Sequence, residues 1–398
     1  MPPIIESTHA NLLQSVEESQ IIVVGAGMFG LTVAERVATQ LDLKVSVLEV
    51  RSHIGGNAYS YFDKQTGIEI HKYGSHLFHT SNERVWSYIR QFTTFNNYKH
   101  RVFAQHKGNT FSLPVNLHTI SQFYGKSFSP LEARELIASE VIERLPGVEP
   151  NFETEALARI GTRLYEAFFH GYTLKQWETD PKDLPASVFS RLPVRYDYNS
   201  DYFSDKYQGL PSDGYGALFE NMIIDKKISV FLETDFFDYK ALIETKNKLV
   251  IYTGPIDRYF SYSKGMLGWR TLDFDIETLN IDDYQGNSVV NYVDLTSPFT
   301  RIHEFKHLHP EREHTENMTV VMHEFSRLAK SNDEPYYPIN SAIDRSLIKQ
   351  YREMMNSIDT KILFGGRLGS YQYLDMHMAI SSALVMFENE IITKEFTK

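Results

Sequence analysis

“IIVVGAGMFGLTVAERVATQLDLKVSVLE”, residues 21–49, contains two short apolar runs with a glycine-rich turn and an amphipathic segment between them. The first run, 21–24, carries no polar residue and is typical of a buried parallel strand. Apolar residues then recur at helical spacing from 31 to 41, and residues 44–49 alternate as a second strand. The stretch therefore predicts a complete βαβ unit.

The turn inside this unit has the spacing G-x-G-x-x-G. Gly25 allows a tight turn, Gly27 lets a pyrophosphate approach the backbone, and Gly30 allows close helix packing. The following helix N-terminus offers free N–H groups to phosphate. Glu49 ends the second strand, where a carboxylate can accept hydrogen bonds from a ribose diol. The pattern predicts dinucleotide binding.

Two further glycine pairs favour FAD over NAD as the dinucleotide. Gly55 and Gly56 follow shortly after Glu49, as in FAD enzymes of the glutathione-reductase and amine-oxidase type. Physically, a second glycine pair lets the backbone pass close to a larger ligand. “FGGRLG”, residues 364–369, lies between an expected strand and helix; its Gly365–Gly366 pair is either a cofactor contact or a plain αβ turn.

The totals of the chain exclude several classes of protein. It has 398 residues, which predicts two or three domains, and no cysteine, which excludes disulfides, thiolate nucleophiles and iron–sulfur clusters. The net charge of -11 argues against nucleic acid as a partner. The first twenty residues lack the pattern of a secretory signal, and no apolar run is long enough to span a bilayer. We therefore expect a cytoplasmic protein with no membrane insertion.

The remaining segments alternate between helical and strand-like patterns. We expect a helix opened by a capping box of Thr80 and Glu83, and a hairpin over 100–113 turning at 107–109. Ser129 begins a helix with Pro130 in its first turn, 155–169 is a second helix, and 248–254 is a buried strand. Antiparallel strands follow from 266 to 326, with helices near 342–357 and from about 375.

The predicted fold is α/β, a Rossmann-like FAD-binding domain with an inserted helical domain and an antiparallel β-sheet domain. The expected boundaries are 20–95, 207–260 and 355–398 for the FAD-binding domain and 110–190 for the helical domain with a mobile substrate loop. The sheet domain is expected to consist of 96–109, 191–206 and 261–354.

“RLPVRYDYNSDYFSDKYQGLPSDGYG”, residues 191–216, combines tyrosines and arginines with turn-forming residues. Buried tyrosine hydroxyls need polar partners, so clustered tyrosines favour a polar ligand. We expect this segment to be a lid, articulated at Gly209, Pro211 and Gly214, that is partly disordered or open without substrate.

Several motifs taken together resemble the bacterial UDP-galactopyranose mutases over about residues 20–390. They include “GYTLKQW” (171–177), “YTGPIDRYF” (252–260), “FTRIHEF” (299–305), “DEPYYPIN” (333–340) and “FGGRLGSYQYLDMHMAI” (364–380). The resemblance implies interconversion of UDP-galactopyranose and UDP-galactofuranose, used in galactofuranose biosynthesis for the cell wall. It implies that N5 of reduced FAD attacks the anomeric carbon and displaces UDP, with no net redox change. It also implies a homodimer.

The resemblance further implies roles for single residues. Catalytic roles fall on Arg191, Arg301 and His76, with the two arginines on the diphosphate. The implied substrate contacts are His100, Tyr172, Thr173, Trp177 on a closing loop, Arg191, Tyr202, Asn291, Arg301, Tyr336, Tyr373 and Asp375. The implied FAD contacts are Gly25, Gly27, Phe29, Gly30, Glu49, Gly56, Asn57, His76, Leu77, Gly366, Arg367, Leu374, Asp375, Met376, Met378 and Ala379.

Some alternatives stay open on the sequence alone. His76 and His79 have the i,i+3 spacing of a metal pair, but no third ligand is evident, so we expect no metal site. An FAD amine oxidase would share the N-terminal fingerprint, but phosphate-suited arginines and a tyrosine-rich segment are poorly matched to a small amine. A non-catalytic flavin-binding module is the third possibility.

Overall fold

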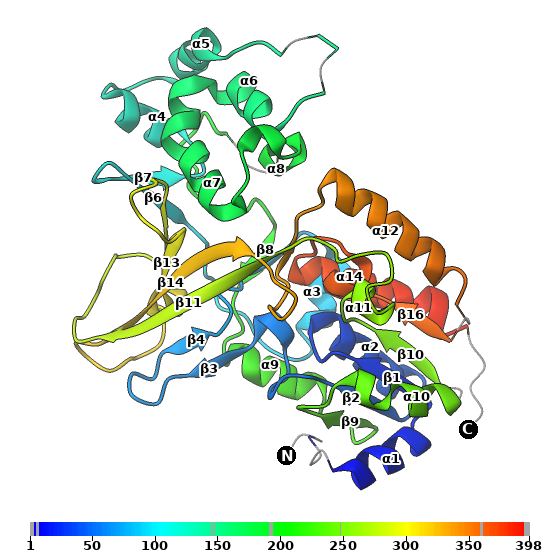
Figure 1. Ribbon diagram of the computed structural model, residues 1–398. Helices are drawn as coiled ribbons and strands as arrows, with labels where there is room; N and C mark the ends of the chain where they lie inside the picture. The colour runs from blue at the N-terminus through cyan, green and yellow to red at the C-terminus, as the bar shows by residue number, and fades with distance from the viewer. Residues whose placement is uncertain are drawn as a thin grey trace.

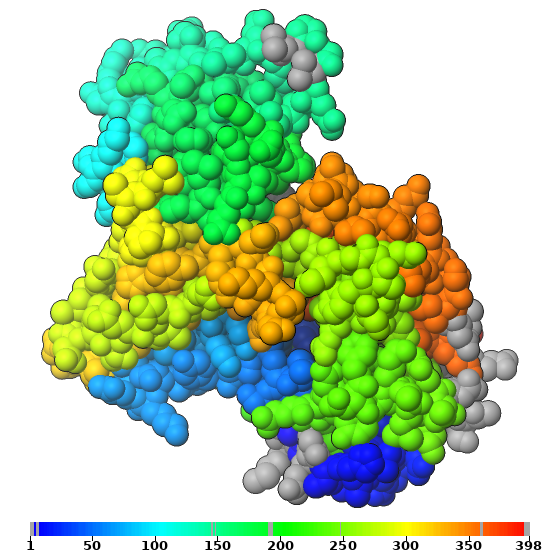
Figure 2. Space-filling model, in the orientation of Figure 1, coloured from blue at the N-terminus to red at the C-terminus, as the bar shows by residue number. Residues whose placement is uncertain are grey.

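A computed structural model of the protein describes residues 4, 8–144, 146–147, 149–190, 194–246, 248–358 and 361–393. The described chain forms a parallel sheet, a large, mainly antiparallel sheet and a block of helices (Figure 1). The space-filling view shows the helical block standing above the large sheet, with a notch between it and α12 (Ala342–Met355) (Figure 2). None of the described helices is long and apolar enough to cross a membrane.

The expected βαβ unit is confirmed and lies at the centre of the parallel sheet. Its strands are in the order β16-β10-β1-β2-β9, and every neighbouring pair is parallel. The strands are β1 (Ile21–Val24), β2 (Val45–Leu48), β9 (Ile228–Phe231), β10 (Leu249–Tyr252) and β16 (Ile362–Phe364). Because β1 is buried at all four positions, it needs helices on both faces of the sheet.

The helices on the two faces of this sheet belong to separate apolar cores. One core joins α2 (Met28–Gln40), α9 (Gly214–Met222) and α14 (Met376–Met386) to the sheet. The other contains residues of α1 (His9–Glu18) and α10 (Phe236–Thr245). α11 (Ile256–Tyr259), α12 and α13 (Gly366–Ser370) share a third cluster beside them. The Rossmann-like part of the predicted fold class is thus confirmed.

The large sheet has seven strands in the order β15-β11-β14-β13-β12-β6-β7. They are β6 (Val102–His106), β7 (Asn109–Leu113), β11 (Trp269–Leu279), β12 (Val289–Tyr292), β13 (Arg301–Glu304), β14 (Thr319–Leu328) and β15 (Tyr337–Pro338). The predicted hairpin is confirmed, with Lys107 and Gly108 at positive φ. All neighbours pair antiparallel except β12 and β6, which are parallel and distant in the sequence.

The helical block follows β7 and packs on the edge of this sheet. It contains α4 (Leu117–Tyr124), α5 (Pro130–Glu140), α6 (Phe152–Tyr165), α7 (Gly171–Trp177) and α8 (Ala186–Ser190). The expected start of α5 is confirmed, with Ser129 and Glu132 forming a capping box. β7 ends at Leu113, past the expected edge of the sheet domain at 109. The predicted domain boundaries otherwise remain a proposal.

The expected cap of α3 (Glu83–Ile89) is wrong by two residues. Asn82, not Thr80, is the N-cap, and its side chain accepts hydrogen bonds from the backbone N–H groups of Arg84 and Val85. Thr80 instead ends β5 (Phe78–Thr80) and accepts a hydrogen bond from Asn82 N at 3.0 Å. Asparagine and threonine can both cap a helix, and here the asparagine directly before the first helical residue does so.

The expected lid over 191–216 is wrong for its second half. Residues 191–193 lie outside the described residues, but β8 (Tyr207–Gly209) pairs with β5 and α9 begins at Gly214. A Cβ on Gly209 would lie 2.3 Å from the Asn96 carbonyl oxygen, and one on Gly214 would lie 2.7 Å from Glu69 Oε1. These glycines permit close packing and do not form hinges.

Candidate functional site

Glycines at the carboxyl end of β1 form the turn that leads into α2. Gly25 has a φ of +100°, and a Cβ on it would lie 2.2 Å from Thr253 Oγ1, just after β10. A Cβ on Gly30 would lie 2.0 Å from the Gly25 carbonyl oxygen. The two residues therefore do what the spacing predicted: one makes the tight turn and the other lets the helix approach it.

Gly27 and Gly56 face each other at the open end of this turn. A Cβ on Gly56 would lie 3.1 Å from the Cα of Gly27. Gly27 is the N-cap of α2, and no side chain caps the helix there. The first N–H groups of α2 are thus free for an anion, and the glycine pair leaves room for it. This cradle fits the pyrophosphate of a dinucleotide.

Glu49 lies at the end of β2 with its carboxylate buried. Its oxygens accept hydrogen bonds from the backbone N–H groups of Ala26 at 2.7 Å and Arg51 at 2.9 Å. Burial raises the pKa of Glu49, against the effect of these two donors. Each oxygen keeps a lone pair that can accept from a ribose hydroxyl. Arg51, missed by the sequence reasoning, donates to Asn57 Oδ1 at 2.8 Å and orients that predicted contact.

The third glycine pair brings a second turn against the first. A Cβ on Gly365 would lie 2.2 Å from Cζ of Phe29, and Gly366 has a φ of +71°. The ring of Phe29, on α2, therefore packs against the turn before α13. The close approach explains both glycines without a cofactor, so the plain-turn alternative is compatible with the structure, although the turn does border the cradle.

The start of α14 is a second helix N-terminus without a side-chain cap. Asp375 is the N-cap residue, yet its carboxylate makes no cap hydrogen bond. The backbone N–H groups that follow are therefore available to a ligand. Leu374 is buried, Met378 is 41% exposed, and Met376 and Ala379 are packed against the main core. Of these predicted contacts, only backbone groups are placed to donate to a flavin.

Arg367 is held by the backbone. Its guanidinium donates to the Leu374 carbonyl oxygen at 2.6 Å and to the Tyr336 carbonyl oxygen at 3.1 Å. Its Cζ also lies 5.2 Å from the centre of the Tyr373 ring. Arg367 therefore connects the start of α14 to the segment that leads into β15. Through these contacts it can position the backbone groups expected to face a flavin.

His76 lies in a loop between the parallel sheet and the large sheet. Its Nδ1 donates to the Gly74 carbonyl oxygen at 2.8 Å, which leaves Nε2 as an acceptor. Mainly through burial, the pKa of His76 is lowered to about 4, so the ring is neutral at neutral pH. Leu77, the next predicted contact, is partly buried against the main core.

Arg301, at the start of β13, is the buried cation of the site. Burial works against its charge, but Glu324 on β14, with Oε1 3.2 Å from Arg301 Nε, raises the pKa of Arg301. Nε makes no well-directed hydrogen bond, so this contact is an ion pair. Nη2 donates to the Tyr172 hydroxyl. Among the described residues Nη1 has no hydrogen-bond partner, which leaves donors for a ligand.

Glu324 connects Arg301 to the His76 loop. Its Oε2 lies 3.0 Å from His303 Nε2, and His303 Nδ1 lies 2.8 Å from Ser75 Oγ. Because the carboxylate must accept, His303 carries its proton on Nε2 and Ser75 donates to Nδ1. A chain of hydrogen bonds thus runs from the loop of His76 to Glu324, and an ion pair continues it to Arg301. The sequence reasoning missed Glu324 and His303, which lie at buried positions of two strands and have no local signal.

Three tyrosines interact with the charge of Arg301, and a fourth, Tyr373, lies beside one of them. Tyr172 is on α7, Tyr202 follows the helical block, and Tyr337 and Tyr373 have ring centres 5.6 Å apart. Burial raises the pKa of each of these four tyrosines, to about 12 for Tyr172, so their hydroxyls stay protonated donors.

The implied substrate contact of Tyr336 stays a prediction, and the structure places its neighbour Tyr337 nearer to Arg301. Tyr337 lies near Arg301 and Asp375, whereas Tyr336 lies near Arg51, Glu334 and Tyr73. Adjacent residues of an extended segment point to opposite sides, and the “YY” pair gave no means of choosing between them.

Asn291, Thr173 and His100 lie around the same cluster. Asn291 pairs with Arg301 across β12 and β13, and its buried Oδ1 has no hydrogen-bond partner. Thr173 is 4% exposed on α7. The His100 ring lies 5.5 Å from that of Tyr202, and its pKa is lowered to about 3, mainly by burial. The unsatisfied amide oxygen points to a missing donor at this place.

Two of the predicted site residues remain, Trp177 and Arg191. Trp177 is the last residue of α7, whose end is held by Glu178, which accepts from Arg270 at 2.9 Å and from Leu328 N at 2.7 Å. Trp177 is thus at the end of a helix in this structure, and its expected place on a closing loop stays a prediction. Arg191 lies outside the described residues.

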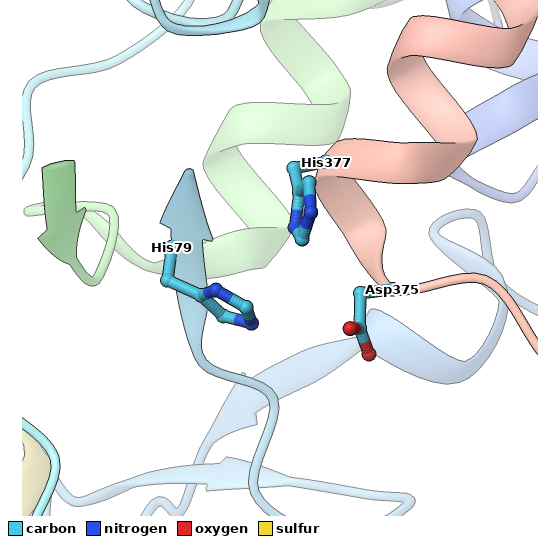
Figure 3. A group of neighbouring side chains, drawn as sticks. All are labelled: His79, Asp375 and His377. Carbon is cyan, nitrogen blue, oxygen red and sulfur yellow. The ribbon is translucent and has the colours of Figure 1, made fainter. Parts of the chain in front are cut away.

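His79, Asp375 and His377 surround one space beside the start of α14 (Figure 3). One potential ligand atom from each lies within 4.8 Å of the others. His79 Nδ1 is bound to Asp205 at 2.6 Å, and His377 Nδ1 is buried without a partner. The sequence pattern of His76 and His79 had no carboxylate beside it. In the structure Asp375, which is distant in the chain, places a carboxylate beside His79. The expectation of no metal stays a prediction.

Most of the chain is similar to known proteins. The profile of the family described as UDP-galactopyranose mutase matches residues 167–373, and that of the NAD(P)-binding Rossmann-like domain matches residues 23–92. A protein of Klebsiella pneumoniae named “Probable UDP-galactopyranose mutase” is 44% identical over 93% of this chain and 94% of its own. The dTDP-fucopyranose mutase of Escherichia coli is 42% identical over 92% and 97%.

A solved structure supports the fold. A crystal structure of reduced UDP-galactopyranose mutase superposes with a TM-score of 0.72 over 95% of both chains, at 16% identity. At this identity the likeness shows the fold alone.

Proposed function

This chain belongs to the UDP-galactopyranose mutase family, whose members are isomerases, and from that premise we propose that it interconverts UDP-galactopyranose and UDP-galactofuranose with FAD as cofactor. The reaction opens and recloses a sugar ring and consumes no electron acceptor. The observation that carries the proposal is the buried Arg301, kept charged by Glu324 and surrounded by tyrosine hydroxyls.

The Arg301 cluster is suited to a nucleoside diphosphate. A guanidinium presents paired donors to phosphate oxygens, and protonated phenols add neutral donors. Tyr172 already contacts Arg301, and Tyr202, Tyr337 and Tyr373 lie around it. As the bond between the sugar and the diphosphate breaks, negative charge grows on the phosphate oxygens, where these donors stabilise it. We propose Arg191 as a second diphosphate ligand.

The cofactor is proposed from the uncapped starts of α2 and α14. The start of α2, with Gly27 and Gly56, would hold the pyrophosphate, Glu49 the ribose, and the N–H groups at the start of α14 the flavin ring. When bound and reduced, FAD supplies the nucleophile, its N5 atom, for the anomeric carbon. The protein's own contribution is to align the sugar and to balance the charge of the departing diphosphate.

Proton positions within the site follow from its hydrogen bonds. His76 is neutral, with its proton on Nδ1 bound to the Gly74 carbonyl oxygen and its Nε2 able to accept from a sugar or flavin group. Asn291 Oδ1 can accept from a sugar hydroxyl. Asp375 is a further acceptor beside the tyrosines. These groups would orient the hydroxyl that recloses the ring.

The decisive assay mixes flavin-loaded protein, dithionite and UDP-galactofuranose. We expect UDP-galactopyranose to form only when the flavin is reduced. A protein that takes up no FAD, or that converts the sugar equally well when oxidised, would refute the proposal. Hydrogen peroxide released from an amine without sugar conversion would indicate an oxidase instead.

Site variants test the assignment of the diphosphate ligands. Arg301→Ala and Arg191→Ala should each lower kcat/KM by about 100-fold or more while flavin stays bound. Tyr337→Phe should lower it by about tenfold, and Tyr336→Phe, its neighbour facing Arg51, should leave it near the wild-type value. Wild-type turnover in Arg301→Ala would remove that residue from the mechanism.

A second substrate has a specific observation in its favour, the 42% identity to dTDP-fucopyranose mutase. That substrate differs in the base and sugar, while the diphosphate is shared. The Arg301 cluster would therefore serve either compound. Parallel kcat/KM measurements with the UDP-galactose and dTDP-fucose pairs decide between them, and we propose that the UDP-galactose pair gives the higher value.

Assembly and location are also proposals. The resemblance implies a homodimer, which light scattering on purified protein would test. We also propose a cytoplasmic location, which cell fractionation would test.

A further inference from the structure

Lys175, on α7, donates to four backbone carbonyl oxygens in one short segment. Its Nζ lies 2.6 Å from Tyr292 O, 2.9 Å from Asp294 O, 3.1 Å from Ser297 O and 2.9 Å from Phe299 O. An ammonium has three N–H groups, so all are engaged by this set. We define residues 292–299 as the carbonyl segment.

The carbonyl segment joins the two strands that carry site residues. It runs from the end of β12, which contains Asn291, to just before Arg301 at the start of β13. A shift of the segment would therefore move both residues. Tyr292 still belongs to the ladder of β12 and β6, and Val293 N donates to the Gln105 carbonyl oxygen at 3.3 Å. The rest of the segment is in no strand, so side-chain contacts help to fix its conformation.

Helix α7 touches the carbonyl segment at two points one turn apart. A Cβ on Gly171 would lie 2.5 Å from the Val293 carbonyl oxygen, and Lys175 is four residues further on the same face of the helix. Glycine permits the contact at the first point, and the ammonium holds it at the second. The next residue after Gly171 is Tyr172, whose hydroxyl contacts Arg301.

The β6–β7 hairpin holds the segment from another side. Asp294 Oδ1 lies 2.7 Å from His106 Nδ1, and its Oδ2 accepts from Lys107 N at 2.7 Å. The side-chain carboxylate of Asp294 thus binds the hairpin, and its backbone carbonyl oxygen accepts the hydrogen bond from Lys175. Lys175 is thus a polar link from α7 to the carbonyl segment.

We propose that Lys175 is a positioning residue for the mutase reaction, which fixes the carbonyl segment against α7 and so sets Tyr172 and Thr173 relative to Arg301 and Asn291. The inference rests on the proposed function. Lys175 touches none of the groups expected to react, and it acts through the Tyr172–Arg301 contact. Its loss should therefore weaken nucleotide binding without affecting the cofactor cradle.

Other contacts keep α7 folded when the ammonium is removed. Ser326 Oγ donates to the Gln176 carbonyl oxygen at 2.7 Å, and Glu178 is held by Arg270 and Leu328. The variant Lys175→Met keeps the length of the side chain and loses its donors. Lys182→Met is the matched control, because Lys182 is an exposed lysine of the same block whose ion pair with Glu153 spans 3.9 Å.

The first measurement is the affinity for UDP. In flavin-loaded Lys175→Met we expect the Kd for UDP and the KM for the nucleotide sugar to rise about tenfold or more, with kcat and the flavin spectrum less affected. Lys182→Met should match the wild type. A Kd within about twofold of the wild-type value would overturn the proposal. If Lys175→Met does not load flavin, Lys175→Arg takes its place, because a planar guanidinium cannot converge on four carbonyls.

A double-mutant cycle separates positioning from general stability. If Lys175 acts through the Tyr172–Arg301 contact, Lys175→Met should add little to the loss of UDP affinity already caused by Tyr172→Phe. Fully additive losses would overturn the proposal. The controls also separate it from the proposed function: a wild-type protein that neither binds UDP nor converts the sugar refutes the function, whereas an active wild type with an equally active Lys175→Met refutes only the role of Lys175.

Discussion

At the scale of single residues, Glu324 shows how a buried charge can be prepared for an anion. It is 3% exposed and faces Arg301 and His303. Burial would raise its pKa, but Arg301 and His303 lower it, so the carboxylate stays charged. Before a substrate arrives, the arginine is thus compensated and held in place, which avoids the cost of an unpaired buried cation.

Replacing Glu324 by Gln removes the negative charge of the side chain and keeps its shape, so the variant tests whether the charge itself is needed. We expect kcat to fall about tenfold or more, because the amide cannot fix Arg301 and also accept from His303 as a carboxylate does. UDP should bind no more weakly, because the anion no longer competes with an internal carboxylate. The measurements are steady-state kinetics and UDP titration of flavin-loaded protein.

Glu304→Gln is the matched control for this variant. Glu304 is also fully buried, but its partners are Thr319, His307 and backbone N–H groups at the far end of β13. It should lose thermal stability and keep its turnover per flavin. Equal losses of kcat in the two variants would show that Glu324 acts only through the stability of the sheet.

At the scale of elements, local patterns identified most of the features that neighbours in sequence decide, with the cap of α3 as an exception. The βαβ unit, the hairpin at Lys107–Gly108 and the capping box of Ser129 depend on residues a few positions apart. Pairings such as β12 with β6 and β5 with β8 depend on contacts between distant segments. The position of Glu324 beside Arg301 arises from such a pairing, and for that reason sequence reasoning missed it.

The correction to the lid has a test at this scale. Gly214→Ala puts a Cβ at a φ of +85° and 2.7 Å from Glu69 Oε1. We expect the free energy of unfolding to fall by about 1–3 kcal/mol, with turnover per folded molecule unchanged. Thermal denaturation and kinetics measure the two effects. Gly67→Ala, at a φ of +70° with no atom within 4 Å, isolates the backbone contribution.

Hydrogen exchange distinguishes this view from a moving lid. Residues 207–216 should exchange slowly with or without UDP, because β8 is paired with β5 and α9 is packed in the main core. Fast exchange there that slows when UDP is added would restore the original expectation for this part of the segment.

At the scale of the whole molecule, the buried histidines make the stability of the folded protein depend on pH. Burial lowers the pKa of His53 and His76 to about 4 and of His71 and His100 to about 3. Unfolding exposes these rings, whose pKa then returns to about 6.5. Between these values the unfolded chain binds protons that the folded chain does not, so acid favours unfolding.

We therefore expect stability to be fully present above pH 6.5 and to fall as the pH drops toward 4. The Tm should be lower at pH 5 than at pH 7.5 by roughly 5 °C or more. His307 has a raised pKa and acts in the opposite direction, but the pKa of His303, His314 and His377 is lowered as well. Calorimetry of flavin-loaded protein across this range, at constant ionic strength, measures the effect. A Tm that stayed level or rose on acidification would contradict this prediction.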